Sequence, residues 1–484
     1  MSLSVPPAPV VPSFAWAKAL ASPATEFAAT SLQGLAGEIP AGLQGTLYRN
    51  GPARLQRGGI TVGHWFDGDG AILRVQFAEG QAVANYRYVQ SAGFQDEEAA
   101  DQYLYRGYGT MAPGSLWQRW RAQIKNAANT SVLALPDRLL ALWEGGLPHG
   151  LDLETLETQG IDALGGLRPS DSFSAHPKRH PRTGEIFSIG VIAGGRPVLQ
   201  IYRCDPSGHV KDTKRIDLNG IPLIHDFALA DRYLVFCVSP VRLNPLPAVF
   251  GLQTFSDALQ WQPKWGTQII VVEADSLEVL AWEQAEPWYQ WHFGHSVLNG
   301  DDTIGLDLVR YADFATNQQL KEVAAGQVLT PAEAQLWHYR IDPHSGKILE
   351  EHCAVERHCE FPVAYVPAEG PALTYLSAHR TLPTPTGDFF DAVAQFNPQT
   401  QEVTLADPGP GYYPSEAIPV PDRHNPGQHW VITVVYNSHD HRSEVWIYDG
   451  NAFGADPVAR LLLPAVIPHS FHGTWHSGLD AWGS

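Results

Sequence analysis

The sequence W-H-Y-R-I-D-P-H-S-G-K-I occupies residues 337–348 and has the form of a β-hairpin. Large and polar residues alternate on both sides of its turn, as they do in strands with one buried face. Pro343 presets one backbone angle of the turn, and Gly346 supplies a positive φ. The same pattern, with variations, recurs at four other places, around Asp205, Asp275, Asn397 and Asp449.

The spacing of these hairpins, roughly 50 to 70 residues, indicates a repeated supersecondary unit. Units of about 40 to 50 residues with insertions are typical of β-propeller blades, which bury their faces by stacking around an axis. We therefore predict an all-β propeller with one domain at residues 26–484. Residues 1–25 are expected to be disordered or loosely attached, because Met1 to Pro12 are rich in proline.

Composition excludes several classes of partner. The net charge of -19 argues against nucleic acid and against long-range attraction to anionic lipid. The four cysteines have no CxxC spacing, which favours reduced thiols in a cytoplasmic protein. We find no signal peptide and no run of eighteen apolar residues, and we predict no obligate protein partner.

Three stretches interrupt the strand pattern. Residues 113–125 place Leu116, Trp117, Trp120 and Ile124 on one helical face. This helix either packs on the body or dips into a membrane surface, with its tryptophans at headgroup level. Residues 244–261 form a second apolar insertion, so the two together predict an exposed patch for peripheral membrane contact. A third short helix is predicted at 330–337, with Thr330 as its N-cap.

The end of the chain is unusual, because residues 467–475 read I-P-H-S-F-H-G-T-W, whereas termini normally fray. We interpret this segment as a plug that returns His472 to the middle of the molecule. Three other histidines have similar strand-like surroundings: His176, His225 and His292. Inner strands of a propeller face its axis, so four histidines from separate blades can converge on one metal ion, which is our hypothesis.

Other interpretations of these residues remain open. Taken singly, each histidine is more often a satisfied core residue than a ligand, and imidazole suits iron, copper and zinc alike. Carboxylates should orient such ligands from behind, and the candidates are Glu144, Glu360 and Glu416. We interpret His439 and His441 as solvated residues at a hairpin tip. We also reject a zinc site formed by His352, Cys353, His358 and Cys359.

Several motifs carry a specific resemblance. They include L-Q-G-T-L-Y-R-N-G-P at 43–52, H-W-F-D-G-D-G at 64–70, L-A-L-W-E-G-G-L-P-H at 140–149 and F-H-G-T-W at 471–475. The segments S-A-H-P, I-H-D-F-A, C-E-F-P, S-E-A-I-P-V-P and H-R-S-E belong to the same ordered set. From about residue 30 to its end, the chain resembles the carotenoid cleavage oxygenases, and most of all the cyanobacterial apocarotenoid 15,15'-oxygenases.

The resemblance implies a seven-bladed propeller with a helical dome over the face that carries the metal. It implies Fe(II) held by His176, His225, His292 and His472, with Glu144, Glu360 and Glu416 behind three of them. It assigns to Thr130 a methyl group that crowds a vacant iron position. It assigns the walls of the substrate tunnel to Phe66, Trp143 and Trp291. The chain departs from the usual motif after the third ligand, which leaves His295 as a rival to His292.

The implied activity is oxidative cleavage, by O2, of a conjugated double bond in an apocarotenoid, an apolar polyene, to give retinal-type aldehydes. Two alternatives are kept: the same iron chemistry on stilbene-type alkenes, and a propeller that binds carotenoid without turnover. The protein is expected in the cytoplasm, with peripheral contact at a membrane surface through 113–125 and 244–261.

Overall fold

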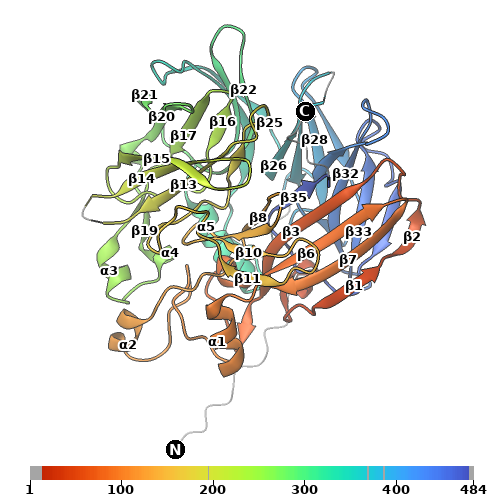
Figure 1. The fold of residues 1–484 in the computed structure, drawn as a ribbon, viewed down its shortest axis with the longest axis horizontal. Helices are drawn as coiled ribbons and strands as arrows, with labels where there is room; N and C mark the ends of the chain where they lie inside the picture. The colour runs from red at the N-terminus through yellow and green to blue at the C-terminus, as the bar shows by residue number, and fades with distance from the viewer. Residues whose placement is uncertain (1–13, 195, 368–369, 385–386, 479–484) are drawn as a thin grey trace, which may run out of the picture.

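Seven antiparallel sheets surround a common axis in the computed structural model, which describes residues 14–194, 196–367, 370–384 and 387–478 (Figure 1). We number these sheets as blades 1 to 7 along the chain. Each blade has an innermost strand, and innermost strands of adjacent blades contact one another at several of the junctions. The predicted all-β, seven-bladed propeller is confirmed.

Blades 1 to 4 are built from the following strands, in order from the axis outward. Blade 1 contains β35 (Gly473–His476), β3 (Gly45–Arg54), β6 (Asp69–Ala78), β7 (Gln81–Tyr88) and β1 (Phe27–Ser31). Blade 2 contains β8 (Ser131–Ala134), β9 (Leu139–Leu142), β10 (His149–Leu151) and β11 (Thr158–Ile161). Blade 3 contains β12 (Lys178–Arg179), β13 (Ile186–Ile192), β14 (Val198–Cys204) and β15 (Val210–Asp217). Blade 4 contains β16 (Ala228–Ala230), β17 (Tyr233–Val238), β20 (Thr267–Glu273) and β21 (Val279–Ala285).

The remaining blades follow the same order. Blade 5 contains β22 (Tyr289–Leu298), β23 (Ile304–Tyr311), β24 (Ala334–Ile341) and β25 (Ile348–Val355). Blade 6 contains β26 (Cys359–Tyr365), β27 (Leu373–Ala378), β28 (Ala392–Asn397) and β29 (Glu402–Ala406). Blade 7 contains β30 (Tyr412–Pro414) and β31 (Ile418–Pro421), which both pair with β32 (His429–Asn437), then β33 (Arg442–Asp449), β34 (Ala459–Leu462) and β2 (Gln33–Gly37). Two small ribbons lie outside the blades: β4 (Gln56–Arg57) with β5 (Ile60–Thr61), and β18 (Val241–Leu243) with β19 (Leu259–Trp261).

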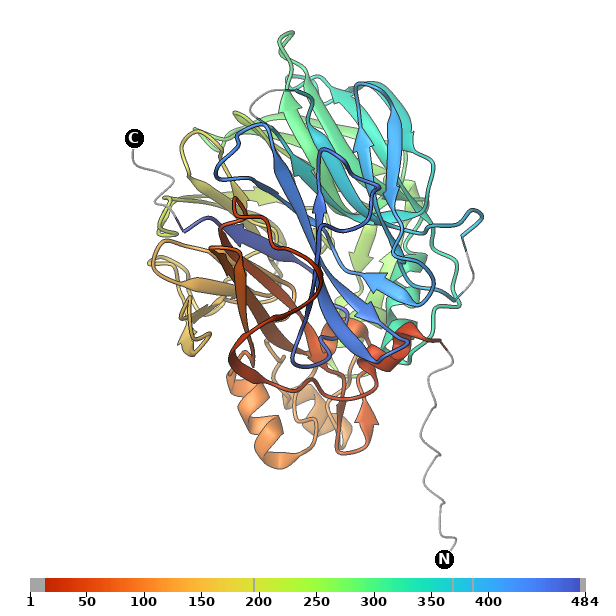
Figure 2. The same cartoon turned by 90° about the vertical axis from the view of Figure 1, so that its right-hand side faces the viewer.

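The ring is closed by both ends of the chain. The N-terminal strand β2 forms the outer edge of blade 7, and the C-terminal strand β35 forms the inner edge of blade 1. Figure 2 shows the dark-blue end of the chain beside the red N-terminal strands. A Cβ at Gly473 would lie 2.8 Å from the carbonyl oxygen of Tyr48, so this glycine permits the close approach that β35 needs.

The hydrophobic core is divided among the seven junctions between blades. Blades 3 and 4, for example, meet through Ile201 and Leu199 on one side and Phe236 and Ile270 on the other. Comparable clusters of buried apolar residues fill the other six junctions. A further cluster lies over the ring and contains Trp16, Trp65 and Phe471. The core therefore holds the blades in a ring and leaves the axis to polar residues.

All five predicted hairpins are present. Each joins the third strand of a blade, counted from the axis, to the fourth, as β24 and β25 do around Asp342. In that turn Gly346 has a φ of +72°, and its N–H donates to the carbonyl oxygen of Asp342. Local turn chemistry therefore placed the outer edges of blades 3 to 7 correctly.

The helices are short and belong to the connections between strands. They are η1 (Trp16–Leu20), η2 (Trp65–Asp67), α1 (Ala92–Ala100), α2 (Leu116–Arg121), α3 (Pro245–Val249), α4 (Phe255–Ala258), η3 (Pro263–Trp265) and α5 (Ala315–Ala324). Figure 1 shows α1, α2 and α3 gathered at the lower left, while α5 lies nearer the centre. None of the helices in the described part of the chain has the length and apolar character needed to cross a bilayer.

Two helix predictions need correction. The helix predicted at 330–337 is wrong, because β24 begins at Ala334 and pairs with β23. Thr330 caps no helix of its own; its N–H and hydroxyl both donate to the carboxylate of Glu322 in α5. The helix predicted at 113–125 is shorter than expected, since α2 ends at Arg121.

The apolar face of α2 points outward, so the interpretation that it packs on the body is wrong. Leu116, Trp117, Trp120 and Ile124 are all exposed, Trp117 to 61 %. The insertion at 244–261 is helical in part, as predicted, and ends in β19. Its exposed residues are Leu246, Val249, Phe250 and Leu252.

The segment predicted to be loosely attached is only partly within the described residues, because Met1 to Ser13 lie outside them. Trp16 is fully buried, and its indole N–H donates to the carbonyl oxygen of Gly387. His469 Nε2 lies 3.0 Å from the carbonyl oxygen of Trp16. Residues 16–20 therefore pack on the body, which corrects the predicted boundary at residue 25.

Candidate metal centre

Every blade delivers at least one side chain to the same place on the axis. The four histidines stand in, or just before, the inner strands of four blades: His472 in blade 1, His176 in blade 3, His225 in blade 4 and His292 in blade 5. Blade 2 contributes Thr130 and Glu144, blade 6 contributes Glu360, and blade 7 contributes Glu416. Residues separated by more than three hundred positions thus meet because the ring brings their strands together.

The four imidazoles form one group. Their potential ligand nitrogens all lie within 4.8 Å of one another, and no second group of this kind is found in the described residues. His176 Nε2 and His225 Nε2 are 2.9 Å apart, and the His176 ring centroid is 4.6 Å from that of His472. The predicted convergence of these four residues is therefore found in the structure.

Three of the four rings are held from behind by carboxylates. The Nδ1 atoms of His225 and His292 lie 2.5 Å from Glu144 and Glu360, respectively, and His472 Nδ1 lies 2.9 Å from Glu416. A proton on each Nδ1 is required for these hydrogen bonds, so each Nε2 presents a lone pair. The fourth ring, His176, has no carboxylate on Nδ1 among the described residues; its backbone N–H donates to Ser174 Oγ.

Two of the carboxylates, Glu360 and Glu416, have pKa values below the ordinary one although they are buried. Burial alone raises the pKa of Glu360, but the His292 ring, the Phe361 N–H and the Tyr311 hydroxyl outweigh it, and the pKa lies below its ordinary value. Burial lowers the pKa of His176 well below its usual range, and the neighbouring histidines lower it further. The centre therefore places a group of buried imidazoles, with His176 neutral, one hydrogen bond in front of carboxylates.

This donor set fits a divalent transition metal. Neutral imidazole is the commonest ligand of such ions, and carboxylates that receive the second ring N–H are typical of metal-bound histidine. His292 Nε2 is buried and has no hydrogen-bond partner among the described residues, although a buried polar nitrogen without a partner is costly. A metal ion held by the four Nε2 atoms would remove this cost.

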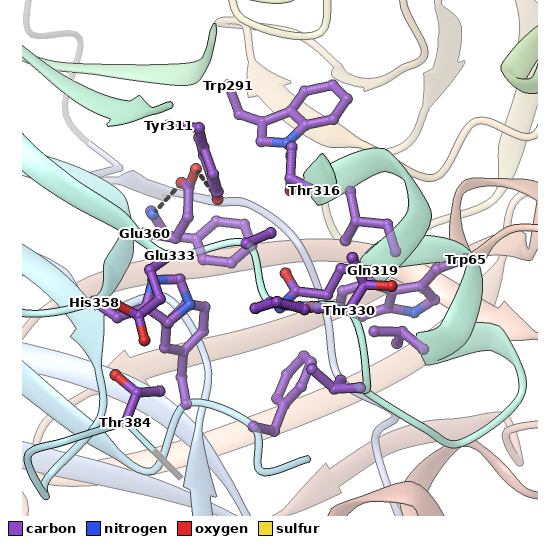
Figure 3. A pocket seen from close by; sticks show the side chains of 18 of the residues that line it. Trp65, Trp291, Tyr311, Thr316, Gln319, Thr330, Glu333, His358, Glu360 and Thr384 are labelled. Atoms are coloured by element: carbon purple, nitrogen blue, oxygen red, sulfur yellow. Dashed lines mark hydrogen bonds between the residues drawn. The ribbon is translucent and has the colours of Figure 1, made fainter. Parts of the chain in front are cut away.

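The centre opens into a cavity with largely apolar walls. His225, His292 and His472 line it, together with Thr130, Phe66 and Trp291. The Phe66 ring packs edge-on against both Trp291 and Phe471, with centroids 5.4 and 5.5 Å apart. Figure 3 shows Trp291, Tyr311 and Glu360 on one side of this cavity and Trp65 with Gln319 on another.

The residues assigned by resemblance are not all brought together. Thr130 lies at the cavity, and its hydroxyl is 3.2 Å from Asn129 Oδ1. Asn129 in turn donates to the carbonyl oxygen of Phe66 and so holds the backbone that carries the Phe66 ring. Trp143 is half-buried and is not among the residues that line the cavity; its ring lies against Gly145.

The rival ligand and the decoys lie elsewhere. His295 is on the same strand as His292 but is not part of the group of four, so His292 is the third member. His439 and His441 are exposed in the turn between β32 and β33, as predicted. All four cysteines are free, and none of them joins a metal-like cluster among the described residues.

Sequence reasoning missed three residues that hold the centre in place. The Asp226 carboxylate accepts the N–H of Phe293 at 2.9 Å and pairs with Lys178 at 2.7 Å, which ties together the strands of three ligands. Tyr311 donates to Glu360. The fully buried Arg49 donates to the carbonyl oxygens of Glu416 and Phe471. For Arg49 the sequence did offer a signal, because a charged side chain is unusual in the middle of a buried strand such as that at residues 45–54.

Comparison with known proteins agrees with this geometry. The sequence profile of the family described as retinal pigment epithelial membrane protein matches residues 20–477. The chain belongs to this family, the carotenoid cleavage oxygenases. Apocarotenoid-15,15'-oxygenase from Synechocystis is 32% identical over 465 residues, which cover 91% of each chain.

Other members of the family are more distant in sequence. Resveratrol cleavage oxygenase 1 from Aspergillus fumigatus is 26% identical and covers 92% of each chain.

The crystal structure of cobalt-substituted Synechocystis ACO superposes with a TM-score of 0.86 at 30% identity, over 95% of this chain and 98% of that one. These relatives are oxygenases, and the present chain is an oxygenase of the same family.

Proposed function

We propose that this protein cleaves a conjugated double bond of an apocarotenoid with O2 and releases retinal-type aldehydes. The observation that carries the proposal is the convergence of four imidazoles, three of which line a cavity with aromatic walls. An apolar, rod-like polyene suits such walls, because its apolar surface is removed from water on binding. The aromatic rings of the wall then fix its position.

Iron(II) is the metal we assign to His176, His225, His292 and His472. Bound ferrous iron supplies the activation of dioxygen that oxidative cleavage of a carbon–carbon double bond requires. The four ligands are neutral, so Glu144, Glu360 and Glu416 balance the charge of the ion from behind and keep each Nδ1 protonated.

The remaining side chains bind and orient the substrate. Phe66 and Trp291 line the cavity next to the histidines and hold the polyene by apolar contact. We assign to Thr130 the narrowing of the space beside the metal, because it lines the same cavity as three of the ligands. No acid or base is needed, since both oxygen atoms of O2 end in the two carbonyl products and no proton is transferred. The place of Trp143 in the wall of the substrate tunnel stays a prediction from the resemblance, since this residue does not line the cavity.

The decisive experiment compares substrates. The purified protein, loaded with Fe(II), is incubated under air with an apocarotenal and, separately, with resveratrol, and the products are separated by chromatography. Retinal-type aldehydes from the first substrate and no cleavage of the second support the proposal. Cleavage of resveratrol alone supports the stilbene alternative, and an iron-free protein without oxygen uptake supports carotenoid binding alone.

We also propose that the exposed patch contacts a membrane surface, from which an apolar substrate can enter. The patch is formed by Leu116, Trp117, Trp120, Ile124, Leu246, Val249, Phe250 and Leu252. Its two halves are adjacent, because a Cβ at Gly251 would lie 3.0 Å from Arg119 Cβ, and Arg106 donates to the carbonyl oxygen of Ala248. The predicted cytoplasmic location then includes a peripheral fraction.

Liposome flotation tests this contact. Replacement of Trp117 and Trp120 by glutamate puts charge into the patch and is expected to abolish flotation on neutral vesicles. Gln118→Glu, on the same helix, adds a charge without removing an aromatic ring and serves as the control. Unchanged flotation of the double variant would show that the patch is not an anchor.

A further inference from the structure

One region of the cavity wall is polar, in contrast to the aromatic surfaces around the histidines. His358 and His379 line the cavity and are buried, with 8 % and 3 % of their surface exposed. Their rings are stacked, with centroids 5.3 Å apart and planes 19° from parallel, and both contact Phe390. Neither residue is part of the metal centre or of its carboxylates.

The hydrogen bonds of His358 fix its tautomer. The backbone N–H of Ala334 donates to His358 Nδ1 at 2.9 Å. The carbonyl oxygen of Ala334 is also near Nδ1, at 3.3 Å, but a proton on Nδ1 would point at the closer N–H. Nδ1 is therefore the acceptor, and the neutral ring carries its proton on Nε2. Burial lowers the pKa of both histidines, that of His379 to about 3, which keeps the two rings neutral.

Side chains with oxygen acceptors line the same cavity as His358. Figure 3 shows Glu333 and Thr384 beside His358, on the opposite side of the cavity from Trp65. His379 Nδ1 is buried without a hydrogen-bond partner among the described residues, and the nearest carboxylate oxygen, on Asp391, is 3.9 Å away. The wall therefore combines one donor of fixed tautomer with several oxygen acceptors.

We propose that this wall recognises a hydroxyl group at one end of the polyene. The inference rests on the proposed function and adds the end-group specificity of the same cavity. A hydroxyl accepts from His358 Nε2 and donates to a neighbouring acceptor, whereas a carbonyl oxygen can only accept and a hydrocarbon ring can do neither. A carboxylate end is excluded by the acidic side chains of Glu333 and Asp388, which also line the cavity.

The hydroxyl could be on the terminal ring or at the cut end of the chain, so two matched pairs of substrates are used. One pair consists of apocarotenals with and without a ring hydroxyl; the other consists of an apocarotenol and the corresponding apocarotenal. Binding is measured by quenching of tryptophan fluorescence, since Trp65 and Trp291 line the cavity, and turnover is measured separately as kcat/KM. For one of the pairs, we expect roughly ten- to a hundredfold tighter binding of the hydroxylated member. This is the cost of leaving a polar group of the wall unpaired: the His358 donor when the ring lacks a hydroxyl, or the neighbouring acceptor when the chain ends in an aldehyde.

Two variants of His358 separate recognition from structure. Asparagine can place an oxygen where Nδ1 stands and keep the Ala334 hydrogen bond, but it has no donor at the Nε2 position. Glutamine can place an N–H at the Nε2 position but loses the bond to Ala334. The proposal predicts that His358→Asn abolishes the hydroxyl preference and that His358→Gln retains most of it.

Each outcome has a definite meaning. Equal binding of both members in both pairs by the unmodified protein would overturn the proposal. The proposal would also be overturned if His358→Asn and His358→Gln changed the affinity ratio within a pair equally, since that result indicates a structural role for His358. If no polyene is cleaved but the binding ratio follows the prediction, the proposed cleavage fails and the end-group inference stands. If the protein cleaves a polyene but His358→Asn leaves the affinity ratio within each pair unchanged, the inference fails and the proposed function stands.

Discussion

Replacement of Glu416 by glutamine is expected to weaken both the metal site and the fold. Glu416 accepts from His472 Nδ1 at 2.9 Å and from the N–H of Gly473 at 2.7 Å. The same carboxylate lies 3.6 Å from the guanidinium of Arg49, which is 1 % exposed. Glutamine keeps the shape of the side chain but replaces one accepting oxygen by an NH2 group and leaves the Arg49 charge without its buried partner.

The size of the effect follows from these contacts. Loss of one partner of a buried ion pair costs about 3 kcal/mol of the free energy of unfolding. The entropy of unfolding is about 2 cal/mol/K per residue, or about 1 kcal/mol/K for a chain of this length, so the melting temperature should fall by about 3 °C. Loss of the orienting carboxylate should also weaken metal binding roughly ten- to a hundredfold.

Glu144→Gln is the matched control, because Glu144 orients His225 in the same way but is 22 % exposed and pairs with no arginine of the described residues. It should weaken metal binding to a similar degree while costing less than about 1 kcal/mol of stability. Metal content is measured after dialysis against buffered free metal, and melting is measured on the metal-free proteins. If the two variants melt at the same temperature, the account of the buried Arg49–Glu416 pair is refuted.

Three other predictions concern the same region. His292→Ala should lose the metal, whereas His295→Ala should keep it; metal analysis that shows the reverse would restore His295 as the third ligand. Asp226→Asn retains every ligand but removes the charge that holds Lys178, so metal affinity should fall about tenfold; an unchanged titration would remove Asp226 from the positioning residues. Burial raises the pKa of Asp67 to about 6, from an ordinary 3.8. The protonated form of Asp67, which the fold favours, is therefore lost as pH rises from 4 to 6. Over that window the stability of the unmodified protein relative to Asp67→Asn should fall by about 2 kcal/mol; denaturant melts at pH 4 and 6 that give the same difference would contradict the assignment.

The outer edges of the blades could be predicted because their signal is local. A D-P-x-S-G turn specifies a hairpin within about ten residues, and the five predicted hairpins are all present. The closure of the ring is different in kind. The pairing of β2 with β34 and of β35 with β3 joins segments more than 400 residues apart, and neither strand carries a local mark of its partner.

The helix wrongly predicted at 330–337 has a related cause. The run A-E-A-Q-L-W contains good helix formers, and helix propensity is a weak preference that tertiary pairing overrides. In the structure Ala334 and Leu336 are buried in alternation against blade 6, and the backbone pairs with β23. The helix of this insertion is α5, which ends at Ala324.

The ligand set shows why sequence reasoning reached the residues but not the geometry. Imidazole serves iron, copper and zinc, so residue type left the metal open. Sequence also gave no distances, because the four histidines carry no local spacing that relates one to another. His176 Nε2 and His225 Nε2 lie 2.9 Å apart because the ring places blades 3 and 4 side by side. The cavity that three of the imidazoles line, together with Thr130 and Phe66, is likewise a product of the ring and has no signal in any one segment.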